Sequence, residues 1–264
     1  VFVRDIRRTQ VIPGYTEIVF HLAAVSGVEE SRAHALQTWD VNVQGTWNVL
    51  EACRQVKSLQ AVVVASSNHV YGAQDRDPVP ESAPLNQLDT YSASKIAADY
   101  IARAYAHNYG LPVSVVRNTN CYGPYDPHHD HIVPATILSC LRGERPVIKS
   151  DGKRKKGYLY VLDVVDAYLA VSEWTARQGK GAVFNVGVRQ IAVYDLVKGI
   201  MVQTGVEGEP TILGEPNDQQ DEWLDDCSLR METDWSNKVQ LKEGLALTID
   251  AFRSEAKETI STPS

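Results

Sequence analysis

The sequence predicts an α/β fold built on a parallel sheet, and two observations lead to this class. Apolar runs of strand length at 16–24, 59–67 and 112–120 alternate with longer segments of helical spacing. The strand runs are apolar along their whole length, which is typical of strands buried on both faces by helices. We therefore expect a parallel sheet with helices covering both sides.

The elements follow one another in a regular order. The first strand run, TEIVFHLAA, is rich in β-branched and aromatic residues, and a segment of helical spacing follows at 40–56. The second run, LQAVVVASS, precedes a helix at 91–110 that Gly110 closes, and PVSVVRNTN forms the third strand. Past residue 121 we expect a short helix at 132–143, a strand at 182–187 and a last helix at 241–256.

This order divides the chain into a sheet domain and a smaller lobe interleaved with it. We expect residues 1–120 to form the sheet domain, with 158–187 returning to it. Residues 121–157 and 188–264 are expected to form the lobe. A chain of 264 residues, 44% hydrophobic and 22% charged, is long enough for such a core.

Composition excludes several classes of protein. A net charge of −7 argues against a protein that coats nucleic acid or an anionic membrane. The four cysteines are scattered without a C-x-x-C pair, so we expect no zinc knuckle and no disulfide framework, and a cytoplasmic location follows. No apolar run approaches the roughly 18 to 20 residues of a membrane span.

The stretch TYSASKIAAD places a tyrosine and a lysine four residues apart at the start of a predicted helix. Tyr91 and Lys95 then share one helical face, and because a nearby cation favours the phenolate, we expect Lys95 to lower the pKa of Tyr91. Ser67 ends the second strand run, at the sheet edge where open α/β folds bind ligands. A hydroxyl donor, a proton carrier and a cation are thus predicted together.

Seven stretches, in order along almost the whole chain, resemble signatures of one family: VFHLAA, VNVQGTWNVLEAC, SSNHVYG, YSASK, RNTNCYGPYD, SDGKRKKGYLYVLDVVDAY and FNVG. On these stretches the sequence resembles the extended short-chain dehydrogenase/reductase family, specifically its nucleotide-sugar epimerases and 4,6-dehydratases. SSNHVYGAQ and DHIVPATILSCLRGERPVI look closest to the CDP-glucose 4,6-dehydratase branch. The resemblance implies a Rossmann-like doubly wound parallel sheet, NAD (or NADP) as cofactor and a nucleotide sugar as substrate.

The resemblance also implies roles for individual residues. Tyr91 takes the proton of the sugar C4 hydroxyl while the dinucleotide removes the C4 hydride, Ser67 hydrogen-bonds the same oxygen, and Lys95 binds the nicotinamide ribose. The 4-keto sugar then permits epimerisation or loss of water, of which we favour water loss. The other implied contacts are Asp5, Ala23, Ala24 and Asn42 for the dinucleotide, and Asn68, Asn120 and Lys156 for the substrate.

The sequence departs from the family pattern in three places. No G-x-x-G-x-x-G or G-x-G-x-x-G occurs in the 264 residues, so we expect weak dinucleotide binding, and a non-catalytic binding or assembly module is the alternative function. Asn68 stands where dehydratases of the family carry Asp, and His69 stands where they often carry Glu or Lys. His69 is either a catalytic acid or base, or an ordinary strand-end histidine. Lys156 stands where many relatives carry an arginine.

Three further features bear on ligands and partners. HHDH (128–131) has the residue types of a metal site, but adjacent histidines in an extended loop point to opposite sides, so no metal is expected. KRKK (153–156) favours a phosphate contact by Lys156 over a nucleic-acid patch. The helices at 40–56 and 91–110 carry apolar residues beyond one face, and because the matching helices of the family pair across a dimer, we expect a homodimer. The aromatic residues concerned are Tyr100, Tyr105 and Tyr109.

Overall fold

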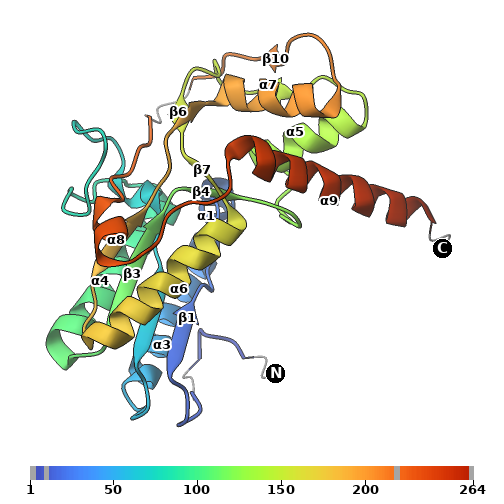
Figure 1. Cartoon of the computed structure of the whole chain (residues 1–264). Helices are drawn as coiled ribbons and strands as arrows, with labels where there is room; N and C mark the ends of the chain where they lie inside the picture. Colours follow the sequence, from blue (N-terminus) through green and yellow to red (C-terminus); the bar gives the residue numbers. More distant parts are fainter. Residues whose placement is uncertain (1–3, 9–11, 217–220, 262–264) are drawn as a thin grey trace. The chain divides into compact units, whose positions relative to one another are not determined.

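The computed structural model describes residues 4–8, 12–216 and 221–261, which fall into two compact units (Figure 1). Unit 1 comprises residues 1–118, 166–186 and 224–235, and unit 2 comprises 119–165, 187–223 and 236–264. The expected division assigned 224–235 to the C-terminal lobe. In the structure this segment belongs to unit 1, because Leu224 packs on Val70 and Val79 there.

Unit 1 is built on a four-stranded parallel sheet. Its strands are β1 (Ile18–His21), β2 (Ala61–Ala65), β3 (Val113–Asn118) and β8 (Val183–Val186), in the spatial order β1-β2-β3-β8. Val63 of β2 lies opposite Phe20 and Ser114, which fixes the register of the first three strands. The predicted α/β fold with a parallel sheet is confirmed.

The helices of unit 1 follow the predicted order with one difference. Where a single helix was expected at 40–56, a π-helical turn, η1 (Trp39–Gln44), runs into α3 (Gly45–Cys53). Helix α4 (Thr90–Tyr109) begins at its N-cap Asp89 and ends at Gly110, whose φ of 63° needs a residue without a side chain. The remaining elements of this unit are α1 (Val28–Ala33), α2 (Ala35–Thr38), η2 (Asn68–Tyr71), most of α6 (Val161–Gln178) and α8 (Cys227–Glu232).

The core of unit 1 lies between the sheet and helices α3 and α4. Val62 and Val64 of β2 are at most 1% exposed and pack with Leu50 of α3 and Ala102 of α4. β2 is buried on both faces, and its pairing with β1 on one side and β3 on the other sets its register. This buried strand fixes the position at which the chain leaves the sheet, after Ala65.

The described residues of unit 2 form three short strand pairs and three helices. Strand β4 (Asn120–Tyr122) runs parallel to β7 (Tyr158–Tyr160), β5 (Val147–Ile148) parallel to β10 (Thr211–Ile212), and β6 (Lys155–Lys156) antiparallel to β9 (Ile191–Ala192). The helices are α5 (Ile132–Leu141), α7 (Val193–Thr204) and α9 (Leu241–Ser261). The strand expected at 112–120 is therefore two strands, because the chain passes from β3 of unit 1 to β4 of unit 2 at Thr119.

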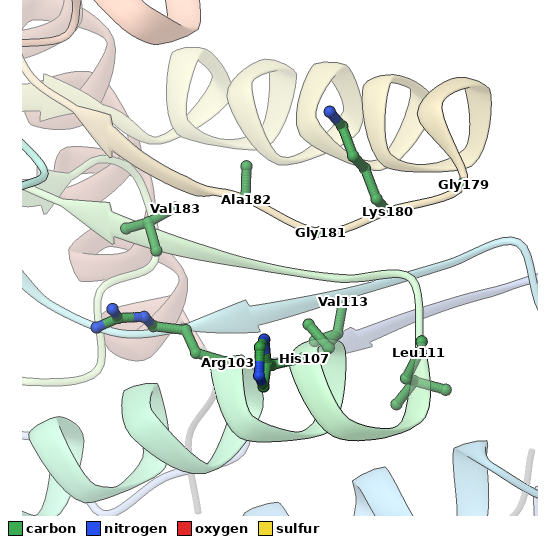
Figure 2. A pocket seen from close by; sticks show the side chains of 11 residues that line it. Arg103, His107, Leu111, Val113, Gly179, Lys180, Gly181, Ala182 and Val183 are labelled. Atoms are coloured by element: carbon green, nitrogen blue, oxygen red, sulfur yellow. The ribbon is translucent and has the colours of Figure 1, made fainter.

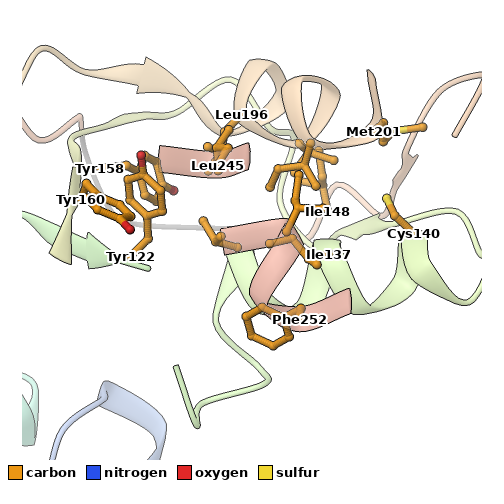
Figure 3. Close-up of a cluster of buried hydrophobic side chains, with 14 residues drawn as sticks. Tyr122, Ile137, Cys140, Ile148, Tyr158, Tyr160, Leu196, Met201, Leu245 and Phe252 are labelled. Carbon is orange, nitrogen blue, oxygen red and sulfur yellow. The ribbon is translucent and has the colours of Figure 1, made fainter. Parts of the chain in front are cut away.

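The core of unit 2 is formed by side chains of α5, α7 and α9 together with aromatic residues of β4 and β7 (Figure 3). The rings of Tyr122 and Tyr160 meet edge to face with centroids 5.8 Å apart. Helix α9 approaches these rings through Gly244, where a Cβ atom would overlap the Tyr122 hydroxyl. Among the described residues, no helix is long and apolar enough to cross a bilayer.

Candidate active site

Ser67 lies just beyond the carboxyl end of β2, in unit 1. Its backbone is extended, with φ −162° and ψ 153°, and its Oγ accepts a hydrogen bond from the backbone N–H of His69 at 3.1 Å. This bond caps the short helix η2, so the turn that ends the strand also fixes the hydroxyl. Ser67 is 6% exposed. The predicted strand-end hydroxyl is therefore buried and held in one position.

Tyr91 lies in the first turn of α4, and its side chain is hydrogen-bonded to Ser67. The helix begins there because the Asp89 carboxylate accepts bonds from the N–H and hydroxyl of Ser92, at 3.0 Å and 2.7 Å. Burial raises the pKa of Tyr91, the Ser67 hydrogen bond works in the opposite direction, and the charge of Asp89 adds to the rise. The predicted proximity of Ser67 and Tyr91 is confirmed.

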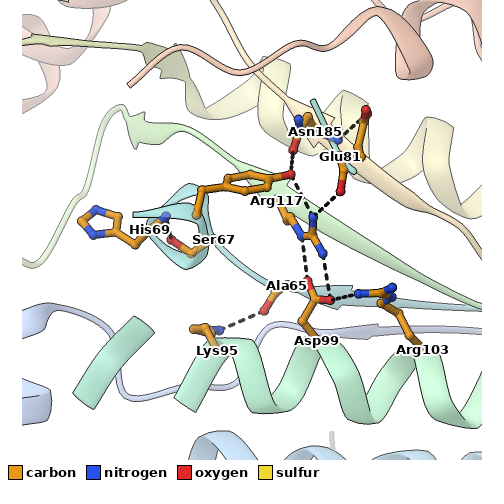
Figure 4. A network of polar contacts seen from close by, with 10 residues as sticks. Ala65, Ser67, His69, Glu81, Lys95, Asp99, Arg103, Arg117 and Asn185 are labelled. Carbon is orange, nitrogen blue, oxygen red and sulfur yellow. Dashed lines mark hydrogen bonds and ion pairs between the residues drawn. The ribbon is translucent and has the colours of Figure 1, made fainter. Parts of the chain in front are cut away.

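Lys95, one turn further along α4, is 6% exposed and donates a hydrogen bond from Nζ to the carbonyl oxygen of Ala65 at 2.9 Å (Figure 4). Burial lowers its pKa to about 8. The prediction that Lys95 lowers the pKa of Tyr91 is wrong, because burial of the phenol dominates and the opposing contribution comes from Ser67. Lys95 instead joins the helix to the end of β2.

His69 lies against the same tyrosine. The ring centroids of His69 and Tyr91 are 6.0 Å apart and the rings are nearly perpendicular, at 81°. Asn68 is 7% exposed, and its Oδ1 lies 3.4 Å from the hydroxyl of Ser67. The structure thus brings five predicted residues together at the carboxyl end of β2 and the start of α4, namely Ser67, Asn68, His69, Tyr91 and Lys95.

Asn42 links the loop after β1 to helix α4. Its Oδ1 accepts the backbone N–H of Val25 at 2.8 Å, and its Nδ2 donates to the Val25 carbonyl at 3.1 Å and to the Ser94 hydroxyl at 2.9 Å. Asn42 is 2% exposed. The predicted dinucleotide contacts Ala23 and Ala24 lie in the loop that it holds. Asn42 therefore positions this loop, and a direct contact with dinucleotide stays a prediction.

His21, the last residue of β1, was missed by the sequence analysis. Its Nε2 lies 2.9 Å from the Thr46 hydroxyl, which itself donates to the carbonyl of Asn42 at 2.6 Å. Because the single hydroxyl proton of Thr46 is used, Nε2 of His21 is the donor. Burial, followed by the charge of Lys95, lowers the pKa of His21 to about 4, so the ring is neutral. Its place at a strand end was the only signal in the sequence.

A buried ion pair that the sequence analysis also missed braces α4 against the sheet (Figure 4). Arg117 of β3 binds both carboxylate oxygens of Asp99, Nε at 2.8 Å and Nη2 at 3.0 Å. Its Nη1 also donates to the Tyr71 hydroxyl and to the Glu81 carbonyl, both at 2.9 Å. Because Tyr71 ends η2, this network holds the turn containing Ser67 in register with α4.

The remaining predicted residues make contacts of their own. Asp5, in unit 1, is paired with Arg7, whose hydrogen bond to the carboxylate lowers the pKa of Asp5 to about 2. Asn120 belongs to unit 2, where its Nδ2 donates to the Gly157 carbonyl at 3.1 Å. Lys156, also in unit 2, lies 3.5 Å from Glu222. The substrate and adenine contacts assigned to these residues stay predictions.

The HHDH stretch forms a tighter group than expected. Ligand atoms of His128, Asp130 and His131 lie within 4.8 Å of one another, and the two histidine rings stack with centroids 4.8 Å apart. His128 and His131 meet because they are three residues apart, whereas adjacent histidines in an extended loop point to opposite sides. The hydrogen bond that His131 Nδ1 donates to the Asp126 carboxylate at 3.1 Å raises the pKa of His131. That no metal binds here stays a prediction.

One hollow in unit 1 lies away from the predicted site. It has a volume of about 340 Å³ and lies at the amino ends of β3 and β8, near the end of α4 (Figure 2). The labelled side chains include Arg103, His107 and Lys180. In parallel sheets, ligands bind at the opposite, carboxyl ends of the strands, where Ser67 and Tyr91 lie.

A parallel sheet flanked by helices, with a serine at a strand end and Tyr-x-x-x-Lys on the next helix, is the arrangement that the resemblance implies for an enzyme using a nicotinamide dinucleotide. The chain belongs to the NAD dependent epimerase/dehydratase family, which matches residues 7–187. The resemblance seen in the sequence is therefore confirmed, and NAD dependence is a property of the family. Both epimerases and dehydratases occur among the relatives.

Among known proteins, the chain is similar to a UDP-glucose 4-epimerase of Mycolicibacterium smegmatis, with 32% identity over 91% of this chain and 77% of the relative. It is 31% identical, over 89% of its length, to a trifunctional UDP-glucose 4,6-dehydratase/UDP-4-keto-6-deoxy-D-glucose 3,5-epimerase/UDP-4-keto-L-rhamnose-reductase of Arabidopsis thaliana. The match spans only 36% of that protein. The crystal structure of a Thermotoga maritima UDP-glucose 4-epimerase with UDP-glucose superimposes with a TM-score of 0.83 at 31% identity, over 91% of this chain and 78% of that one. The Rossmann-like fold is thus confirmed.

Proposed function

We propose that this protein is an NAD-dependent enzyme that converts a nucleotide-diphosphate hexose through transient oxidation at C4, as a 4,6-dehydratase rather than a 4-epimerase. The observation that carries this proposal is that Ser67, at the end of β2, lies close enough to Tyr91 to lower the pKa of its phenol, with buried Lys95 one turn away on the same helix. This arrangement supplies a proton carrier and a second hydroxyl for one substrate oxygen.

One observation on the described residues of unit 1 supports a bound dinucleotide. The hydroxyl of Ser66, beside Ser67, is buried and has no hydrogen-bond partner among the described residues, as expected where a ligand completes the contacts. Lys95 and Tyr91 would hold the nicotinamide ribose, and Ala23 and Ala24 would line the dinucleotide. When bound, the dinucleotide supplies the acceptor and donor of the C4 hydride.

Tyr91 and Ser67 would act on the sugar C4 hydroxyl. Tyr91 would act in its phenolate form, which takes the hydroxyl proton while the C4 hydride passes to the bound dinucleotide, and the carbon becomes a ketone. Ser67 donates to the same oxygen and lowers the pKa of Tyr91 through its hydrogen bond. Lys95 is buried on the same helix and has a pKa of about 8, so it still carries a positive charge at pH 7. We propose that this charge is needed while the proton passes between the sugar hydroxyl and Tyr91.

His69 favours dehydration over epimerisation. A 4-epimerase needs one proton carrier, whereas water loss needs a group that removes the C5 proton and a group that delivers a proton to the departing C6 hydroxyl. The His69 ring, 6.0 Å from Tyr91, is a second side chain able to donate or accept a proton, while Asn68 cannot donate a proton as an acid does. His69 is proposed as the acid or base of this step.

Two proposals concern binding and assembly. In unit 2, Asn120 and Lys156 would contact the diphosphate of the substrate. In unit 1, a homodimer would form through α3 and α4, which pack together and expose Trp47, Tyr100 and Tyr109, about half exposed each. Light scattering at high protein concentration tests the dimer. A mass of 29.2 kDa, that of one chain, would contradict it.

The proposed reaction is tested with a panel of CDP-, dTDP-, UDP- and GDP-hexoses at saturating NAD, following the 4-keto product. The parent should form a 4-keto-6-deoxy sugar from at least one of them. Tyr91→Phe should form none, while keeping the far-UV spectrum and melting temperature of the parent. Failure of all the nucleotide sugars, or parent-level turnover by Tyr91→Phe, would contradict the proposal.

A second variant separates the two reactions. The His69→Gln variant should still oxidise the sugar at C4. It should no longer eliminate water, because only the elimination uses this ring. Deuterium wash-in at C5, measured by NMR, reports that step. If His69→Gln forms the 4-keto-6-deoxy product at the parent rate, His69 is not the acid or base of the elimination, and if the parent forms only the C4 epimer, the 4-epimerase becomes the better assignment.

A further inference from the structure

Unit 2 contains two inward-facing cations that share one carboxylate. Arg154 and Lys156 are alternate residues of the chain around β6, so their side chains leave it on the same side, whereas Lys155 between them is exposed. Arg154 Nη2 lies 2.5 Å and Lys156 Nζ 3.5 Å from Oε1 of Glu222. The three side chains are only 8%, 16% and 17% exposed. The group therefore carries a net positive charge away from bulk water.

The backbone holds Glu222 in this place. Its N–H donates to the Lys155 carbonyl at 3.0 Å, and it forms a parallel bridge with Lys156. Asn120 Nδ2 lies 3.4 Å from its second oxygen, Oε2. A guanidinium, an ammonium and an amide thus surround one carboxylate. These are also the donors that proteins use for phosphate.

We propose that Arg154 and Lys156 together form the binding site for the diphosphate of the nucleotide sugar, and that Glu222 occupies this site as an intramolecular competitor. The proposal rests on the proposed function for its ligand, and it adds one residue that binds and one that regulates binding. Glu222 sets the affinity, because substrate must displace its carboxylate from both cations.

Charge explains why the exchange favours a diphosphate. Arg154 presents the planar fork that a lysine at 156 lacks, so it binds two phosphate oxygens where the lysine binds one. Burial lowers the pKa values of Lys156 and Arg154, and the charge of Glu222 opposes this effect in both residues. The two cations have lost part of their hydration, so an anion is needed to stabilise their charged forms. A diphosphate brings more negative charge than one carboxylate and satisfies both cations at once.

The test is calorimetric titration of the full chain with inorganic pyrophosphate and with UDP, and uridine serves as the uncharged probe. Glu222→Gln should bind pyrophosphate and UDP about tenfold more tightly, because the competing charge is gone, with no change for uridine. Arg154→Gln should bind both about tenfold more weakly. Glu144→Gln is the matched control, since it removes the same charge in unit 2 from an exposed pair with Arg142 and should change nothing.

Unchanged or weaker pyrophosphate binding by Glu222→Gln would overturn the proposal, and so would equal tightening by Glu144→Gln. If Glu222→Gln does not fold, Arg154→Lys decides, because it keeps the charge and the pair with Glu222 but loses the fork. It should bind pyrophosphate several-fold more weakly, and unchanged binding would overturn the proposal. These titrations need neither dinucleotide nor turnover, so their outcome is independent of whether a 4-keto sugar forms.

Discussion

Arg117 and Lys95 are both buried cations of unit 1, and their surroundings differ. Arg117 is 1% exposed and binds both oxygens of Asp99, which is itself fully buried. Lys95 is 6% exposed and is bonded to the Ala65 carbonyl; no carboxylate among the described residues is in ion-pair contact with it. The charge of Arg117 is neutralised by the Asp99 carboxylate, whereas Lys95 is stabilised only by the dipole of a backbone carbonyl.

The pKa values express this difference. Burial works to lower the pKa of Arg117, but the hydrogen bond and charge of Asp99 outweigh it, so that pKa is raised. For Lys95, burial acts without such opposition and lowers the pKa to about 8. A buried charge without a counter-charge costs stability and is concentrated at functional sites. We infer that Arg117 serves the fold and that Lys95 serves the reaction.

The largest effect is expected from Arg117→Met. This substitution leaves the Asp99 carboxylate buried without its partner, so the free energy of unfolding should fall by about 3 to 5 kcal/mol. Urea denaturation measures it. Arg103→Met is the control, because Arg103 is 46% exposed and lies 3.6 Å from the same carboxylate, and it should cost less than about 1 kcal/mol. Equal losses would mean that the buried pair contributes no more than the exposed one.

A smaller effect, on rate rather than stability, is expected from Ser67→Ala. Turnover should fall by about 10²-fold, as for the loss of one catalytic hydrogen bond. Because the Ser67 bond lowers the pKa of Tyr91, the acidic limb of the pH–rate profile should also move to higher pH. An unshifted limb with the same loss of rate would leave Ser67 as a substrate contact alone.

The smallest effect is expected from Asp89→Asn. The charge of Asp89 contributes to the raised pKa of Tyr91, so its removal should move the acidic limb of the pH–rate profile to lower pH. Asparagine is also a good N-cap, so the free energy of unfolding should change by less than about 1 kcal/mol. A shift towards higher pH would contradict this electrostatic role.

Sequence patterns predicted what depends on neighbours along the chain. The strand run at 59–67 and the helix at 91–110 were predicted from local composition, and the corresponding β2 (Ala61–Ala65) and α4 (Thr90–Tyr109) bring Ser67 to Tyr91. The partners of the cations could not be predicted, because Ala65 and Lys95 are 30 residues apart and Arg154 and Glu222 are 68 apart. Burial was also underestimated, and it reversed the expected direction of the Tyr91 pKa shift.

The contrast between the two cations is tested most directly by Lys95→Met, through unfolding free energy and turnover together. The pKa of Lys95 is about 8 in the folded protein, against 10.5 for an unfolded lysine. The charged side chain therefore lowers the free energy of unfolding by about 3 kcal/mol below pH 8, and this loss is relieved as the pH rises towards 10.5. After losing the bond to Ala65, Lys95→Met should still be about 2 kcal/mol more stable than wild type at pH 7. This advantage should largely disappear by pH 10, and formation of the 4-keto sugar should be lost at both pH values. A variant that is less stable than wild type at pH 7, or that turns over substrate at the wild-type rate, would contradict the functional role of Lys95.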